Sequence, residues 1–398
     1  MGKASNPRSA VAAIDLYCRK TNGRTLKRLG SCIGASIGKN KTESRTSVVA
    51  QAEKLEILRN RRLKNGETCV TAIDAGISNF AYSMFKWYKD DEVPTLVEWN
   101  KINLCQKFLG KHRLKMKMDP EDTWKVGHGL LDMFTNKMAT SDLYVIEKQR
   151  TRSLSSKNVL ESVLLSNVME HILFSNLRNK QLYENADGKY AVDSSNPQKM
   201  AQYWCDVKSL KTLYVRFAQS AGLKVQNDLP TNDSDSILTT KVSKTIRINL
   251  VKTILKNAII PQGYRKCNVT PQWRSKVEEQ LHVGKKFKLL DCVGLGPELG
   301  TRKDDDLADC FLHGLVWMQW LRIYESVAET LTRNGGVFDQ KVLKEFNEYC
   351  MSLNTEWTYM SAEMKGTLAE LKLTNNLENG ANEEEMKTNK LVKRKNKL

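Results

Sequence analysis

The sequence has no long hydrophobic segment and no cysteine spacing of the kind that builds a metal site. In its 398 residues no apolar run approaches the roughly 20 residues that a helix needs to cross a bilayer, so we expect no membrane partner. The chain contains 5 histidines, and its 9 cysteines are scattered, with no Cys-x-x-Cys pair. These spacings argue against a zinc site and a disulfide framework, and they favour a reducing compartment.

Positive charge is what the sequence has in excess. There are 63 lysines and arginines against 45 aspartates and glutamates, which gives a net charge of +18 and an isoelectric point near 9.4. Because each phosphate that a basic side chain neutralises releases a condensed counterion, this balance favours a nucleic-acid partner. The alternative is a soluble protein that is merely basic and has no nucleic-acid partner.

The first 65 residues hold much of this charge, with 15 basic and 4 acidic side chains. We expect residues 1–65 to be helical, with two short helices joined by a Gly-rich turn. This segment is either a solvated helical cap on the next domain or a small element that binds the DNA backbone. In the second case its contacts would be Lys27, Arg28, Lys39 and Lys41.

Short apolar runs then alternate with amphipathic segments, which predicts an α/β domain over residues 66–335. Five strands are expected in a sheet of mixed direction, since the first two look like a hairpin. We place these strands at 68–74, 79–85, 95–99, 143–147 and 190–192, and helices at 120–137, 157–178, 245–256 and 306–324. Residues 225–244 are expected to form a flexible connection and 264–303 an irregular basic stretch. A helical extension at 336–374 and a disordered charged tail at 375–398 complete the prediction.

Acidic residues stand at three informative places in this pattern. Asp74 ends the first strand, Glu147 ends the fourth, and an Asp-rich segment from Asp304 to Asp309 opens a late helix. Asp309 is three residues after Asp306 and four after Asp305, and either spacing puts two carboxylates on one helix face. A helix N-terminus also favours acids for purely structural reasons, but that does not explain acids at two strand ends.

Carboxylates that converge without histidine or cysteine suit a hard cation, Mg²⁺ or Mn²⁺. Two such ions about 3.5–4 Å apart would activate a water and stabilise the leaving oxygen of a phosphodiester. The residues therefore predict a two-metal nuclease. The candidate catalytic residues are Asp74, Glu147, Asp305, Asp306 and Asp309. The spacing leaves open whether Asp305 or Asp306 joins the others as a metal ligand.

Three motifs resemble the RuvC-like branch of the ribonuclease-H superfamily, and among its members the fungal mitochondrial Holliday-junction resolvases. They are the run from Asp74 to Ala81, Glu147-Lys148-Gln149-Arg150-Thr151-Arg152, and the segment from Arg302 to Asp309. The similarity extends over about residues 10–330. The stretch from Leu29 to Lys41 is similar to the family's SAP-like DNA-binding element.

The resemblance implies a ribonuclease-H-like fold and a homodimer that nicks opposed strands of four-way junction DNA, in mitochondria and with Mg²⁺. It implies no small-molecule organic cofactor. The resemblance carries over Asp74, Glu147 and Asp309 as metal ligands, while Asp305 and Asp306 compete for the fourth place. The three-residue spacing in the bacterial branch favours Asp306 as that metal ligand, although the helix face also admits Asp305. A nuclease acting on RNA–DNA hybrids and a non-catalytic DNA-binding scaffold are the alternative functions.

Further basic residues are candidates for DNA contact. Arg150 and Arg152 follow Glu147 closely and would hold phosphates beside the metals, or form a surface pair. Lys244 and Arg247 lie on a basic segment that either contacts the junction arms or is a solvated face. Arg302 and Lys303 precede the Asp-rich segment, and His313, one turn beyond Asp309, is expected to be a core or rim residue and not a base.

Overall fold

The computed structural model describes residues 9–110, 112, 116–117, 119–138, 140–149, 161–184, 191–204, 234–259, 265–283, 287–293 and 304–332. The predicted helical extension at 336–374 and the tail at 375–398 lie outside these residues, as do Arg150, Arg152, Arg302 and Lys303. No helix among the described residues is both long and apolar enough to cross a membrane.

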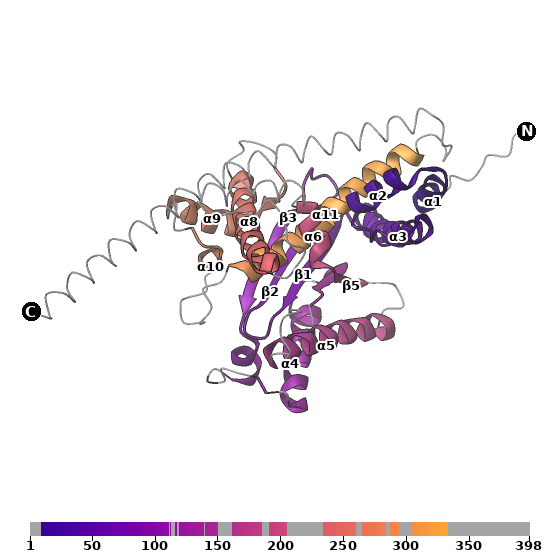
Figure 1. Ribbon diagram of the computed structural model, residues 1–398. Coiled ribbons are helices and arrows are strands. Elements are labelled where there is room, and N and C mark those ends of the chain that lie inside the picture. The colour runs from indigo at the N-terminus through magenta and orange to yellow at the C-terminus, as the bar shows by residue number, and fades with distance from the viewer. Residues whose placement is uncertain are drawn as a thin grey trace, which may run out of the picture.

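A mixed sheet with the strand order β5-β4-β1-β2-β3-β6 forms the centre of the molecule (Figure 1). Strands β1, β2 and β3 form an antiparallel meander, and β4 and β5 run parallel to β1 on its other side. The strands are β1 (Glu67–Ala75), β2 (Phe80–Tyr88), β3 (Thr95–Ile102), β4 (Leu143–Glu147), β5 (Ala191–Ser195) and β6 (Asn268–Val269).

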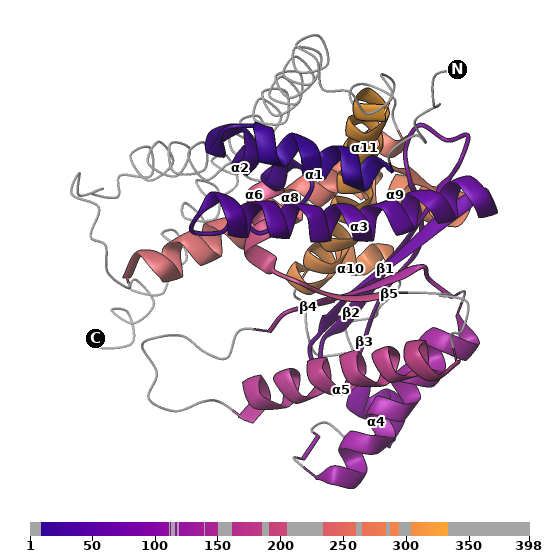
Figure 2. The ribbon, with the colours of Figure 1, turned by 90° about the vertical axis from the view of Figure 1, so that its right-hand side faces the viewer.

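Side chains alternate between the two faces of this sheet, because successive residues of a strand point to opposite sides. In β4, Leu143 and Val145 enter one hydrophobic core, whereas Tyr144 and Ile146 enter the other. The second core is covered by α4 (Pro120–Asp132), α5 (Glu161–Glu184) and the short π-helices Cys105–Leu109 and Met133–Lys137, which form the lower layer in Figure 2.

The long helix α11 (Asp305–Thr332) crosses the opposite face of the sheet and is buried along most of its length. The N-terminal helices α1 (Ala10–Lys20), α2 (Gly23–Cys32) and α3 (Lys41–Asn65) pack around its far end (Figure 2). Gly34 lies there with a φ of +78°, directly against the indole of Trp320. Helices α6 (Pro197–Trp204), α8 (Ser234–Ile259), α9 (Pro271–Val283) and α10 (Leu289–Cys292) complete this layer.

Three local predictions were wrong. The sheet has a sixth strand, β6, which pairs with Thr95 and Leu96 of β3 but is too short to show an alternating pattern. Residues 234–244 begin helix α8 and are not part of a flexible connection. The stretch predicted to be irregular contains α9, where Trp273 and Val277 are buried against the core. For α9 tertiary packing supplied the apolar surface that the local sequence shows only weakly.

Candidate active site

Asp74 and Glu147 lie side by side at the ends of two neighbouring strands. The parallel register of β1 and β4 pairs Ile73 with Ile146, so the two acids are the next residues on each strand. Asp74 shares a sheet face with Val70 and Ala72, and these side chains point toward α11. Glu147, which follows Val145 by two residues, points to the same face.

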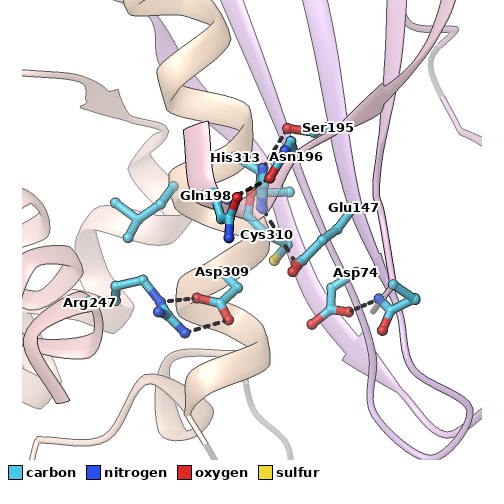
Figure 3. A network of polar contacts seen from close by, with 12 residues as sticks. Asp74, Glu147, Ser195, Asn196, Gln198, Arg247, Asp309, Cys310 and His313 are labelled. Atoms are coloured by element: carbon cyan, nitrogen blue, oxygen red, sulfur yellow. Dashed lines mark hydrogen bonds and ion pairs between the residues drawn. The ribbon is translucent and has the colours of Figure 1, made fainter. Parts of the chain in front are cut away.

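Helix α11 begins opposite this pair and supplies the remaining acids. Figure 3 shows Asp309 projecting from the first turns of α11 into the region that Asp74 and Glu147 enter from the sheet. Asp304 has a separate role, because its carboxylate accepts hydrogen bonds from the backbone N–H groups of Leu289 and Leu290, each at 3.1 Å, at the start of α10.

Three cationic side chains hold the aspartates of α11. The Lys101 ammonium, on β3, lies 2.7 Å from the Asp306 carboxylate, and the Lys101 side chain is only 3% exposed. The Arg247 guanidinium binds both carboxylate oxygens of Asp309, at 2.5 and 3.0 Å (Figure 3). Lys244, one turn earlier on α8, pairs with Asp305. A fork of two hydrogen bonds fixes a carboxylate more firmly than a single contact does.

Burial and mutual repulsion disfavour negative charge at this site. Burial raises the pKa of Asp74 well above its usual value, and the nearby carboxylates of Glu147, Asp306 and Asp309 raise it further. Burial also raises the pKa of Asp309 to about 6, although Arg247 opposes the change. The pKa of Asp306 is raised by burial and lowered by Lys101. Repulsion among buried acids is relieved when a cation lies between them.

The chemistry of these donors fits a hard divalent cation, since every candidate ligand is a carboxylate. Within the described residues, no three Asp, Glu, His or Cys side chains are gathered closely enough to coordinate one ion in their present orientations. Asp306 and Asp309 are instead turned toward Lys101 and Arg247. Binding an ion here would require these two carboxylates to turn away from Lys101 and Arg247.

Sequence reasoning missed the neutral residues that surround the acids. The Gln149 side chain donates a hydrogen bond of 3.1 Å to the Asp74 carboxylate, and its backbone N–H donates one of 2.7 Å to the buried Glu170 of α5. His313 lies between Ser195 and Glu147. Gln149 follows the strand-end acid Glu147 by two residues, and that position was the only local indication that it lies near the site. Nothing in the sequence links Ser195 to His313.

The predicted DNA-contact residues fall in two places. Lys244 and Arg247, on α8, lie beside the acids of α11. The predicted contacts in the N-terminal helices lie elsewhere. The α2–α3 segment packs near Trp320, which is roughly 16 Å along α11 from Asp309. In that segment Lys27, Lys39 and Lys41 are exposed and Arg28 is half-buried, and Lys41 donates to the carbonyl of Arg19.

Comparison with known proteins adds an independent line of information. A family model for the mitochondrial resolvase Ydc2 and the RNA-splicing protein MRS1 matches residues 70–327. The mitochondrial cruciform cutting endonuclease 1 of Saccharomyces cerevisiae is 35% identical over 346 residues, which cover 82% of this chain and 91% of that protein.

Two further matches are more distant. The mitochondrial RNA-splicing protein MRS1 of Saccharomyces paradoxus is 26% identical over 86% of this chain and 92% of its own length. The crystal structure of the yeast mitochondrial Holliday junction resolvase Ydc2 aligns with a TM-score of 0.45 and 18% identity, covering 77% of this chain and 95% of that one.

Proposed function

This chain belongs to the family of mitochondrial resolvases and mitochondrial RNA-splicing proteins, and we propose that it is a mitochondrial endonuclease that resolves four-way DNA junctions. The observation that carries the proposal is the placement of Asp74 and Glu147 on adjacent strands, opposite Asp306 and Asp309 on α11. Four clustered carboxylates whose repulsion raises the pKa of Asp74 are costly to fold, and a protein that only binds nucleic acid has no use for them.

We assign the divalent ions, Mg²⁺ in the cell, to Asp74, Glu147, Asp309 and Asp306. Asp306 is preferred over Asp305 because its charge acts on Asp74 and raises the pKa of that carboxyl. Both aspartates have a lysine partner, so pairing does not distinguish them. When bound, a pair of such ions supplies an activated water and neutralises charge on the scissile phosphate.

The remaining groups of the site orient the acids and attract the substrate. Gln149 fixes the Asp74 carboxylate, and Lys101 and Arg247 fix the two aspartates of α11. Arg247 and Lys244 sit on the side of α8 that borders the acids, where a phosphate backbone drawn in by the net charge of +18 would meet them. The exposed basic residues of α2 and α3 would bind a more distant part of the DNA.

Symmetric nicking of opposed strands needs two active sites, so we propose a homodimer. Helix α5 supports this assignment, because Leu164, Leu182 and Tyr183 expose 44%, 66% and 86% of their surface. Leu182 and Tyr183 are neighbours near the end of α5, and we place the contact with the second copy at that end.

Cleavage of defined substrates tests the proposal. Labelled four-way junction, plain duplex and RNA–DNA hybrid are incubated with the protein in Mg²⁺ and in EDTA. We expect paired symmetric nicks in the junction alone, which disappear in EDTA and in Asp74→Asn while junction binding persists. Asp132→Asn is the matched control, since that carboxylate pairs with Lys137 at the surface and should keep full activity.

Other outcomes point elsewhere. Cleavage of the hybrid in place of the junction would replace the resolvase assignment by a ribonuclease one. Junction binding without any cleavage would indicate a scaffold, or a role like that named for the RNA-splicing relatives. Activity that survives Asp74→Asn would refute the metal-site assignment.

A further inference from the structure

His313 is a fully buried polar side chain that the proposed reaction does not itself use. It lies on α11 one turn after Asp309, is 1% exposed, and has the buried Leu312 and Leu315 as neighbours on the helix. Its Nδ1 is 2.8 Å from the Ser195 hydroxyl, and its Nε2 is 3.4 Å from Oε2 of Glu147 (Figure 3). The imidazole therefore spans the space between a hydroxyl and a candidate metal ligand.

The strand register explains why these three side chains meet. Glu147 and Ser195 are paired across β4 and β5, and each is the last residue of its strand. Ser195 is itself held in place, since its carbonyl accepts a 2.9 Å hydrogen bond from the backbone N–H of Lys148. The next residue, Asn196, precedes α6, and its side-chain oxygen accepts a hydrogen bond from the backbone N–H of Gln198. Helix α11 packs on this face of the sheet and places His313 beside the pair.

We propose that Ser195 and His313 act together as a positioning pair that orients the Glu147 carboxylate for the metal. A neutral imidazole carries one N–H, and the bond made by one ring nitrogen decides which nitrogen has it. When the Ser195 hydroxyl donates to Nδ1, the proton is on Nε2 and the N–H faces Glu147. The two atoms are 3.4 Å apart and not yet hydrogen-bonded, so the bond would form as the carboxylate takes its position at the metal. Groups that hydrogen-bond a ligating residue commonly contribute 10- to 100-fold in metal affinity.

This inference rests on the proposed function, because it requires Glu147 to bind the ion. A positioning role for His313 can be distinguished from a purely structural one by what a substitution changes. A histidine that only fills the core would affect the free energy of unfolding, whereas a positioning residue changes metal affinity in a protein that is still folded.

Replacing His313 by asparagine or by glutamine distinguishes the roles of the two ring nitrogens. His313→Asn places an amide near the position of Nδ1 and keeps the contact with Ser195, while His313→Gln reaches the position of Nε2 and the Glu147 carboxylate. Mn²⁺ binding to the DNA-free protein is measured by electron paramagnetic resonance, with thermal unfolding measured in parallel. Gln319→Met is the matched control, since Gln319 is equally buried on the same helix but donates to the carbonyl of Lys266.

We expect His313→Asn to weaken Mn²⁺ binding roughly 10- to 100-fold, His313→Gln to restore most of it, and Ser195→Ala to weaken it several-fold. Gln319→Met should lower thermal stability and leave Mn²⁺ binding unchanged. Wild-type Mn²⁺ affinity in folded His313→Asn would overturn the inference. Should His313→Asn not fold, unchanged affinity in Ser195→Ala overturns it instead. The metal-site assignment itself is tested separately with Asp74→Asn. If that variant binds Mn²⁺ as the wild type does, the assignment of the metal site fails, whatever the His313 variants show.

Discussion

The ion pair between Lys101 and Asp306 is buried enough that breaking it should be costly. The Lys101 side chain is 3% exposed and that of Asp306 is 21% exposed, with 2.7 Å between nitrogen and oxygen. Lys101→Met keeps the aliphatic stem but removes the charge, so the Asp306 carboxylate loses the cation that lowers its pKa. Removal of one partner from a buried pair costs about 3–5 kcal/mol, and the partial exposure of Asp306 places this case near the lower end.

Thermal and urea unfolding in EDTA measure this loss. A stability change of about 3 kcal/mol corresponds to roughly 4–5 °C in Tm for a folded unit of this size, since the entropy of unfolding scales with chain length. Lys101→Met/Asp306→Asn should recover much of the loss, because the unpaired charge is gone. Saturating Mg²⁺ should also reduce the loss, as the proposed ion takes over the charge of Asp306.

The pair of Lys54 and Asp193 provides the control. It has the same distance of 2.7 Å, but the Lys54 side chain is 46% exposed, so Lys54→Met should cost less than about 1 kcal/mol. Equal losses in Lys101→Met and Lys54→Met would refute the reasoning, as would a double variant no more stable than Lys101→Met.

Three further predictions follow from single residues. Because the pKa of Asp309 is raised to about 6, the folded protein binds this proton more tightly than the unfolded chain, and stability from this group is present below pH 4 and is lost as pH rises through 6. The raised pKa values of Asp74 and Asp306 add losses of their own, so unfolding in EDTA should show a loss with rising pH that is about 3 kcal/mol smaller in Asp309→Asn. Gly34→Ala should cost about 2–4 kcal/mol, because its φ is +78° and a Cβ would lie 2.4 Å from the Trp320 ring, whereas Gly23→Ala, with nothing within 4 Å, should be neutral in urea unfolding. Asp304→Ala should cost about 1–2 kcal/mol through loss of two backbone hydrogen bonds at α10, with Asp304→Asn retaining part of the stability in the same assay.

Local patterns were sufficient to predict the elements that carry the acids. The runs ending in Asp74 and Glu147 were predicted as strands and are strands, and the helix that begins at Asp305 was predicted to begin at 306. A run of apolar residues that closes with an acid is a local signal, so it can be read without knowledge of the partners. The family was predicted from the same motifs and is confirmed.

The residue types and their spacing were enough to predict the type of chemistry and the segments that carry it, namely carboxylates without nitrogen or sulfur ligands in a basic chain. Which groups surround those carboxylates depends on the fold. Lys101 is 205 residues from Asp306, and Ser195 is 118 residues from His313, and no local pattern records contacts made across such separations. Sheet register and the crossing of α11 bring these side chains together, and burial at that crossing sets their charges.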